Sequence, residues 1–181
     1  KRQADVNKGL IEDLTGLHIP YDIDTIIDLA GDIIERSKYG LRYEKVMYNS
    51  KDANGNDVEI SALLIVPWKL FQKPSLPILG YNHGTELYRG FAPSSFKDNP
   101  LGVLNFPEVI IASAMASSGY IVIMPDYQGM GESNDIQPYC HKIQGRQSAD
   151  AIKVAKQYTK KPWKFGRLFS PVSWNKKLYL I

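Results

Sequence analysis

The spacing of apolar residues along the chain changes near residue 40. From Tyr21 to Tyr39 apolar residues recur three and four positions apart, which is typical of an amphipathic helix, and residues 4–14 form a shorter stretch of this kind. Gly40 stands where a glycine commonly follows the last turn of a helix. We therefore predict a helical N-terminal arm over residues 1–40 that packs on a sheet, with a partner-binding helix as the alternative.

After residue 40 the pattern becomes that of β-strands. Residues 41–48 and 58–66 are rich in β-forming side chains, and the segment between them contains the turn dipeptide Asn54-Gly55. This pattern predicts an antiparallel hairpin with a generous loop over residues 49–57.

Three later runs are apolar without polar alternation: residues 76–82, 120–124 and 177–181. Such runs are typical of strands that are buried on both faces of a parallel sheet. Helical patterns at 107–119 and 143–158 lie between them, and Glu108 suits the positive end of the first helix dipole. We therefore predict an α/β domain over residues 41–181 with a mixed, mostly parallel sheet.

The composition is close to the average of globular proteins. The 181 residues are 44% apolar and 23% charged, which excludes a disordered tail, a collagen and a coiled coil. Lys and Arg number 22 against 19 Asp and Glu, and a net charge of +3 is too small to indicate a nucleic-acid-binding surface. The longest apolar run, residues 109–124, is interrupted by serines and a glycine, so we expect no integral membrane segment. The chain starts at Lys1 without an apolar signal core, which indicates a processed or trimmed start.

The sequence predicts neither a metal site nor a cofactor. Cys140 is the only cysteine, which excludes an intrachain disulfide and a multi-cysteine zinc site, and we expect it to be a buried packing residue. The chain has three histidines: His18, His83 and His141. Their spacing is not that of a ligand set. Gly129 and Gly131 do not extend into a dinucleotide fingerprint, because Asn134 stands where the third glycine belongs.

Two loops that follow apolar strands carry the candidate chemistry. Residues 83–85 read His-Gly-Thr, where the glycine lets the backbone approach a ligand and free N–H groups can bind a developing oxyanion. A tight turn with a hydrogen-bonded histidine is the plainer interpretation of this loop. The second loop covers residues 125–133, where two glycines allow a sharp path that Asp126 can brace by accepting backbone N–H bonds.

These two loops, in this order and spacing, resemble those of the α/β-hydrolase superfamily. The resemblance lies in three segments: Tyr81-Asn-His-Gly-Thr85, the run from Gly119 to Ser133, and Pro138-Tyr-Cys-His141. The last segment, with a helix behind it, looks like the branch of esterases and lipases related to secretory lipases. The resemblance covers residues 41–181 and implies that the strand at 76–82 lies between the strands at 120–124 and 177–181.

The resemblance implies a serine hydrolase with a Ser-Asp-His triad that forms an acyl-enzyme. Thr85 would give its backbone N–H to the oxyanion, while His83 and Gly84 would shape the oxyanion loop. The neighbouring loop would be held by four residues: Asp126, Tyr127, Gly129 and Gly131. Three aromatic side chains are candidates for contact with the substrate: Tyr88, Phe91 and Tyr127.

The nucleophile of such an enzyme lies in a Gly-x-Ser-x-Gly turn just after the fifth strand. This pattern does not occur in residues 1–181, and residues 177–181 match the strand that leads into it. The other candidate nucleophiles are poor substitutes: Ser113, Ser133, Ser148 and Cys140. We therefore expect this chain alone to be inactive, with the triad supplied by a missing C-terminal half.

The resulting hypothesis is the N-terminal part of an enzyme that hydrolyses carboxylic esters of small molecules or lipids. The alternative is a non-catalytic domain of the same fold that binds a ligand or a partner. A secreted or cell-envelope location fits the family resemblance, the missing initiator Met and the lone cysteine. A trimmed cytoplasmic protein also fits the missing Met and the lone cysteine.

Overall fold

A computed structural model describes residues 37–70, 72–84, 88–97, 107–133, 136–160 and 172–181. Residues 1–36 of the predicted helical arm and Thr85 lie outside these residues. Residues 37–39 are not helical, and Gly40 is the first residue of β1 rather than the residue that ends a helix. The elements in chain order are β1 (Gly40–Lys51), β2 (Asp57–Trp68), β3 (Ser75–Gly80), η1 (Arg89–Phe91), η2 (Pro93–Lys97), α4 (Pro107–Ser118), β4 (Ile121–Pro125), α5 (His141–Tyr158) and β5 (Ser173–Leu180).

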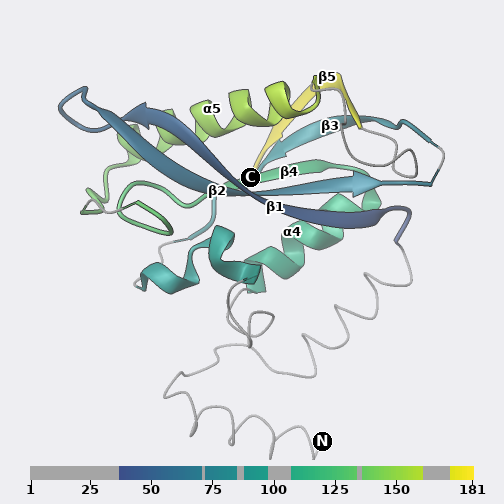
Figure 1. The fold of residues 1–181 in the computed structure, drawn as a ribbon, viewed down its shortest axis with the longest axis horizontal. Helices are drawn as coiled ribbons and strands as arrows, with labels where there is room; N and C mark the ends of the chain where they lie inside the picture. The colour runs from purple at the N-terminus through teal and green to yellow at the C-terminus, as the bar shows by residue number, and fades with distance from the viewer. Residues whose placement is uncertain (1–36, 71, 85–87, 98–106, 134–135, 161–171) are drawn as a thin grey trace, which may run out of the picture. The chain divides into compact units, whose positions relative to one another are not determined.

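The five strands form one mixed sheet in the order β1-β2-β4-β3-β5 (Figure 1). The strand β2 pairs antiparallel with β1 and with β4, whereas β3 pairs parallel with β4 and β5. Four strands therefore run in one direction and β2 alone runs against them. The predicted α/β fold class is confirmed, and so is the place of β3 between β4 and β5.

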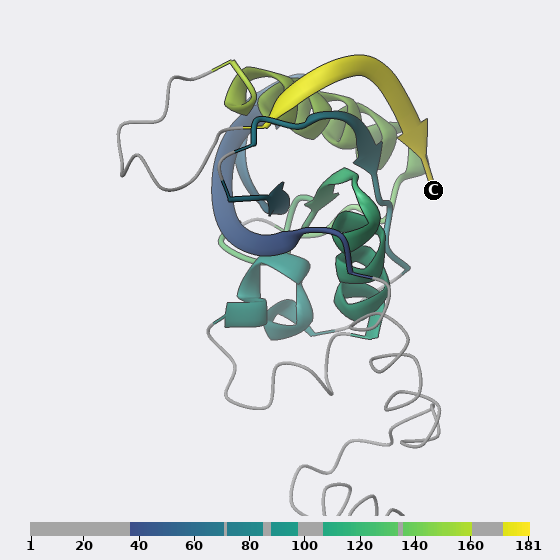
Figure 2. The same cartoon turned by 90° about the vertical axis from the view of Figure 1, so that its right-hand side faces the viewer.

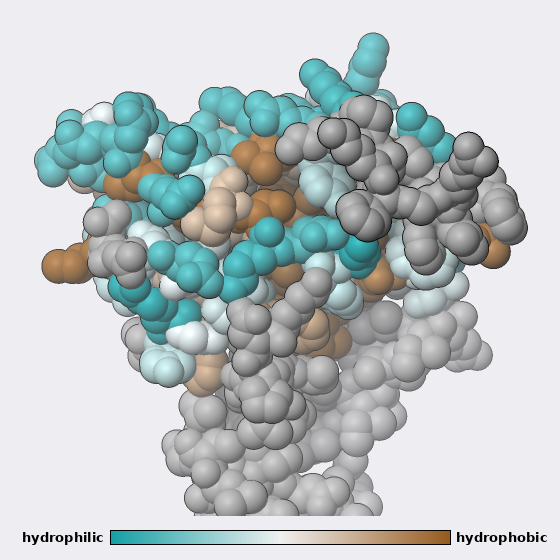
Figure 3. All heavy atoms as spheres, viewed as in Figure 1, coloured by the Kyte–Doolittle hydropathy of each residue, from teal (hydrophilic) through white to brown (hydrophobic). Residues whose placement is uncertain are grey.

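The sheet has a helix layer on each face, as Figures 1 and 2 show from two sides. The helix α5 packs against β1, β3 and β4, while α4 packs against β1, β2 and β4. Hydrophilic side chains line the upper edge of the face in Figure 3, where α5 runs. This agrees with the amphipathic pattern of α5, which buries Ile143, Ala151, Ile152 and Ala155 and exposes much of its other face.

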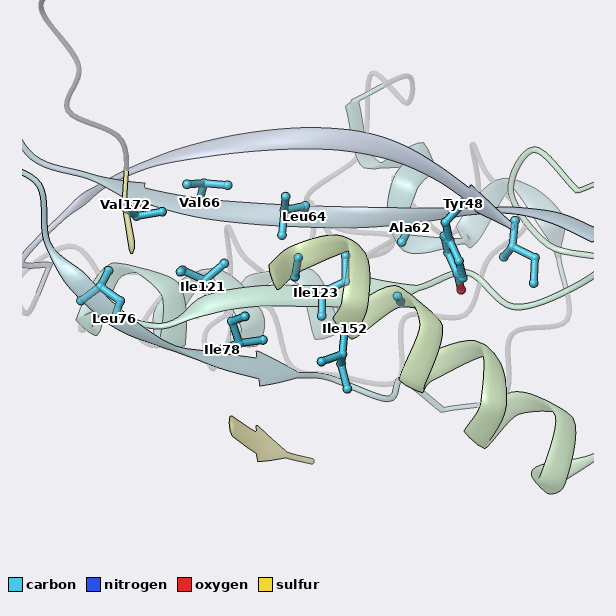
Figure 4. Packing of buried hydrophobic residues seen from close by; sticks show 13 residues of the cluster. Tyr48, Ala62, Leu64, Val66, Leu76, Ile78, Ile121, Ile123, Ile152 and Val172 are labelled. Atoms are coloured by element: carbon cyan, nitrogen blue, oxygen red, sulfur yellow. The ribbon is translucent and has the colours of Figure 1, made fainter. Parts of the chain in front are cut away.

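The strands β2, β3 and β4 have both faces buried, each in a different hydrophobic cluster. The predicted burial of residues 177–181 is wrong, because β5 lies at the edge of the sheet and leaves Leu178, Tyr179 and Leu180 exposed. On β2, Ile60 and Leu64 belong to the cluster under α5, whereas Leu63 and Ile65 belong to the cluster under α4. This alternation follows from the two-residue period of a strand. Figure 4 shows the cluster under α5, to which β1, β2, β3, β4 and α5 all contribute.

The hairpin is longer and its loop shorter than the sequence pattern predicts. The strands continue to Lys51 and restart at Asp57, so the loop covers residues 52–56 rather than 49–57. The Asp52 carboxylate accepts the backbone N–H groups of Asn54 and Asn56, each at 2.8 Å, and Gly55 supplies a positive φ of 87°. An aspartate that caps its own turn lets a tight loop form, and apolar periodicity does not report this.

The edge strand β5 starts at Ser173, four residues before the predicted start at Lys177. Its register with β3 shifts between Leu76, opposite Trp174, and Ile78, opposite Leu178. Pro77, which lies at this shift, has no N–H to donate to the ladder. The early part of β5 is polar, and an apolar pattern therefore does not detect it.

Candidate functional site

A cleft of about 480 Å³ lies at the carboxyl ends of β3, β4 and β5. Its walls are Asn82, His83, Gly84, Tyr127, Leu180 and residues of α5 between His141 and Ile152. In open α/β sheets, ligands bind at this edge of the parallel strands. The two loops singled out in the sequence, 83–85 and 125–133, both contribute described residues to this cleft.

His83 joins the loop after β3 to the end of β4. Its side chain is buried, with Nε2 2.8 Å from the carbonyl oxygen of Pro125 and Nδ1 2.8 Å from the carbonyl oxygen of Gly84. Its ring lies against the ring of Tyr127, with 4.9 Å between centroids. Carbonyl oxygens only accept hydrogen bonds, so the ring can donate but finds no proton to take from either neighbour. This environment suits a residue that shapes the loop, and it does not suit a general base.

Gly84 directs its backbone N–H toward the carboxylate of Glu108, with N–O distances of 3.1 and 3.3 Å. Glu108 lies in the first turn of α4, where a carboxylate also interacts favourably with the helix dipole. The sequence pattern indicated only this second interaction. Because the Gly84 N–H is already bound, Thr85 is the next candidate donor along the loop, and it lies outside the described residues.

Asp126 is fully buried and connects β2 and η2 to the end of β4. Its carboxylate accepts the hydroxyl of Ser61 at 2.5 Å and the backbone N–H of Ser94 at 2.9 Å. Burial raises the pKa of this carboxyl above its ordinary value, while the two hydrogen bonds act in the opposite direction. The sequence predicted that Asp126 accepts N–H groups of its own loop, residues 125–133. It accepts the N–H of Ser94 in η2 instead.

The glycines of the second loop leave no room for a side chain. A Cβ atom on Gly131, whose φ is 55°, would collide with the Asp126 carboxylate and the Ser61 hydroxyl. A Cβ on Gly129, whose φ is 84°, would collide with the backbone of Gln137. The Gly129 N–H donates to the buried Ser133 hydroxyl at 3.0 Å.

Tyr127 is the non-glycine residue of this loop that adopts a left-handed backbone, with a φ of 67°. Its ring is buried against His83, and its hydroxyl lies 3.4 Å from Oδ1 of Asn82. Burial raises the pKa of this hydroxyl above its ordinary value of 10.0, so it stays protonated at neutral pH. Tyr127 thus lines the cleft with a protonated hydroxyl that donates to Asn82.

Two of the aromatic residues predicted to contact substrate do not line this cleft. Tyr88 is 63% exposed and contacts Phe91 edge to face, with 5.0 Å between ring centroids. Phe91 packs against the cluster under α4. The structure therefore groups Tyr127 with the cleft and places Tyr88 and Phe91 together in and beside η1.

The candidate nucleophiles in this chain have no catalytic partner among the described residues. Ser113 donates to the carbonyl oxygen of Val109, and Ser148 donates to Oδ1 of Asn82 at 2.6 Å. Cys140 is exposed at the start of α5, so the expectation of a buried packing cysteine is wrong. Cys140 directly precedes α5, which begins at His141, two residues earlier than predicted. The chain is exposed to solvent at this point, and the thiol is therefore exposed as well.

Solved structures of two proteins resemble this chain over most of its length. One is a protein from Legionella pneumophila described as a hydrolase, with a TM-score of 0.63 and 26% identity over 83% of this chain and 39% of that chain. The other is LipA from Xanthomonas oryzae, described as a rice cell wall degrading esterase, with a TM-score of 0.63 and 25% identity over 87% of this chain and 38% of that chain. The chain has the α/β-hydrolase fold.

The chain spans about two fifths of the length of both solved relatives. No protein-family model matches the sequence, and no curated protein matches it. The α/β-hydrolase fold thus rests on the sheet order, the two loops at the cleft and the solved structures.

Two further features concern only the described part of the chain. None of its helices is both long and apolar enough to cross a membrane. Nor do three or more His, Cys, Asp or Glu side chains of these residues come together in a group that could hold a metal ion.

Proposed function

We propose that this chain is the N-terminal part of a serine hydrolase that cleaves carboxylic esters through an acyl-enzyme. One observation carries the proposal. His83 and Gly84 meet Tyr127 of the loop after β4 at one cleft, beside the end of β5, in a fold shared with an esterase. In that fold the nucleophile turn follows the fifth strand, so its serine would enter the cleft directly after Ile181.

The chemistry assigned to this chain is stabilisation of negative charge. When a serine attacks the ester carbonyl, its oxygen becomes an oxyanion that needs preorganised N–H donors. We assign one donor to the backbone N–H of Thr85 and the other to the residue after the nucleophile. His83 holds the loop through the Pro125 carbonyl, and the Glu108 carboxylate holds the Gly84 N–H.

The substrate is a small-molecule ester or a lipid, and the fitting location is outside the cell or in its envelope. LipA is described as degrading the rice cell wall, which supports an extracellular assignment. Tyr127 lines the cleft and is the first candidate for contact with the substrate. Tyr88 and Phe91 are candidates only for a substrate long enough to extend beyond the cleft.

The test compares two substitutions at Thr85 in the protein made from its complete reading frame. Thr85→Pro removes the N–H donor and should lower kcat for a short activated ester about 10²- to 10³-fold. Thr85→Ala keeps the donor and should retain most of the activity. Thermal midpoints of both variants control for folding. A folded Thr85→Pro variant with near-parental kcat would mean that Thr85 is not the donor, and a parent without ester turnover would favour a binding domain.

A further inference from the structure

Asn82 connects four parts of the structure at the rim of the cleft. It follows β3, and its backbone N–H and side-chain Nδ2 both donate to the carbonyl oxygen of Ile181, at 2.8 and 3.0 Å. Its Oδ1 accepts the Ser148 hydroxyl of α5 at 2.6 Å, and the Tyr127 hydroxyl lies 3.4 Å from the same oxygen. Hydroxyls can donate and a carbonyl oxygen can only accept, so these partners fix the orientation of the amide.

Asn82 lies where the backbone pairing between β3 and β5 ends. Ile181 is the residue that directly follows β5, and its N–H donates to the carbonyl oxygen of Gly80 at 3.0 Å. The main-chain ladder therefore reaches as far as Asn82, and the side-chain amide adds one more bond to the same carbonyl. With two donors from one residue, both lone pairs of the Ile181 carbonyl oxygen are used.

We propose that Asn82 is a positioning residue, which sets the distance between the oxyanion loop and the backbone that leaves β5. This inference rests on the proposed function, which puts the nucleophile turn directly after Ile181. Asn82 immediately precedes His83 and Gly84, so it links the residue before the nucleophile turn to the loop that carries the oxyanion donor. A misplacement of about 1 Å between such groups costs on the order of 10²-fold in rate.

The first test uses Asn82→Ala in the protein made from its complete reading frame, with Asn56→Ala as the matched control. Asn56 lies in the hairpin loop, outside the residues that line the cleft, and its Nδ2 makes a comparable exposed bond to Asp52 at 2.9 Å. Asn82→Ala should lower kcat about 10- to 100-fold and change KM less than about twofold, because alignment matters most in the transition state. Asn56→Ala should leave both unchanged. A folded Asn82→Ala variant with kcat within twofold of the parent overturns the proposal.

The second test uses Asn82→Asp, which has the same shape but replaces the Nδ2 donor by an oxygen. At neutral pH the introduced carboxylate repels the Ile181 carbonyl, whereas the protonated carboxyl can donate to it. Because an ordinary aspartate has a pKa of about 3.9, the ratio of variant to parental kcat should rise as pH falls below about 5 toward 4, and taking the ratio removes the parent's own pH profile. A ratio that does not change with pH would indicate a structural role only.

The third test does not need activity. Hydrogen exchange of the peptide that spans β5 and the residues after it should be at least about fivefold faster in Asn82→Ala than in the parent or in Asn56→Ala. Unchanged exchange overturns the positioning role, whatever the activity. Faster exchange in a protein whose parent has no ester turnover overturns the proposed function, and with it the catalytic part of this inference.

Discussion

At the scale of single residues, a buried carboxylate organises the loop after β4, which contributes Tyr127 to the cleft. Asp126 accepts bonds from β2 and η2, and Gly131 passes over it in a backbone conformation that leaves no space for a Cβ atom. The Ser61 hydroxyl, which donates to Asp126, also accepts the N–H of Glu132 at 3.0 Å. The loop after β4 is therefore held by a few tightly packed polar contacts.

Gly131→Ala should destabilise the protein by about 2–4 kcal/mol, because overpacking adds to the cost of a left-handed backbone. The matched control is Gly55→Ala in the hairpin loop. Gly55 also has a positive φ, of 87°, but its Cβ would meet nothing within 4 Å, so only the backbone cost of about 1 kcal/mol applies. Unfolding in urea would measure both values. Equal losses for the two variants would argue against the crowding at Asp126.

The ionisation of Asp126 should weaken the folded state as pH rises. Burial raises its folded-state pKa above the ordinary 3.8, so the folded state holds the proton more tightly than the unfolded state does. This contribution favours folding at low pH and is lost as pH rises above 3.8 through the folded pKa. Asp126→Asn cannot ionise, so its free energy of unfolding relative to the parent should improve between pH 4 and pH 8.

Asp52→Asn supplies a control of opposite sign for this pH series. Hydrogen bonds from Asn56 and Asn54 lower the pKa of Asp52, so its ionised form favours the folded state once pH exceeds 3.8. This contribution is complete once pH is well above 3.8, so the stability of this variant relative to the parent should stay nearly level from pH 5 to pH 8 and rise only as pH falls below 3.8. A flat difference for Asp126→Asn would contradict the assignment of a raised pKa.

Some site residues could be predicted from the sequence and others could not. His83, Gly84, Asp126 and the two loop glycines were found because each occupies a fixed place in a loop after an apolar strand. The contacts of Glu108 and Asn82 were missed, because each joins residues that are far apart in the sequence. No local pattern reports that the carbonyl of Ile181 meets a side chain 99 residues away.

At the scale of elements, apolar periodicity predicted the existence and type of the helices and strands better than their boundaries. The strands β2, β3 and β4 were found because both of their faces are buried. The ends of β1 and the first half of β5 were missed, since most of these residues are polar and give no continuous apolar run. The start of α5 moved to His141 for a similar reason, because His141 and Lys142 are exposed and add nothing to the apolar pattern that begins at Ile143.

At the scale of the whole molecule, the order of the strands links the fold to the proposed chemistry. With β3 between β4 and β5, the two loops that follow β3 and β4 and the end of β5 all reach one cleft. The strand order itself was predicted from the family resemblance, because periodicity does not tell which strands are neighbours. The position of Thr85 stays a prediction.

The most direct measurement of the central claim maps a serine-directed phosphonate on two proteins. One is the protein made from its complete reading frame, and the other is the chain of residues 1–181. We predict one adduct in the complete protein, on a serine that follows Ile181 in a Gly-x-Ser-x-Gly turn, and neither adduct nor ester turnover in residues 1–181. An adduct on Ser133 or Ser148, or a complete protein that neither reacts nor hydrolyses esters, would contradict the account.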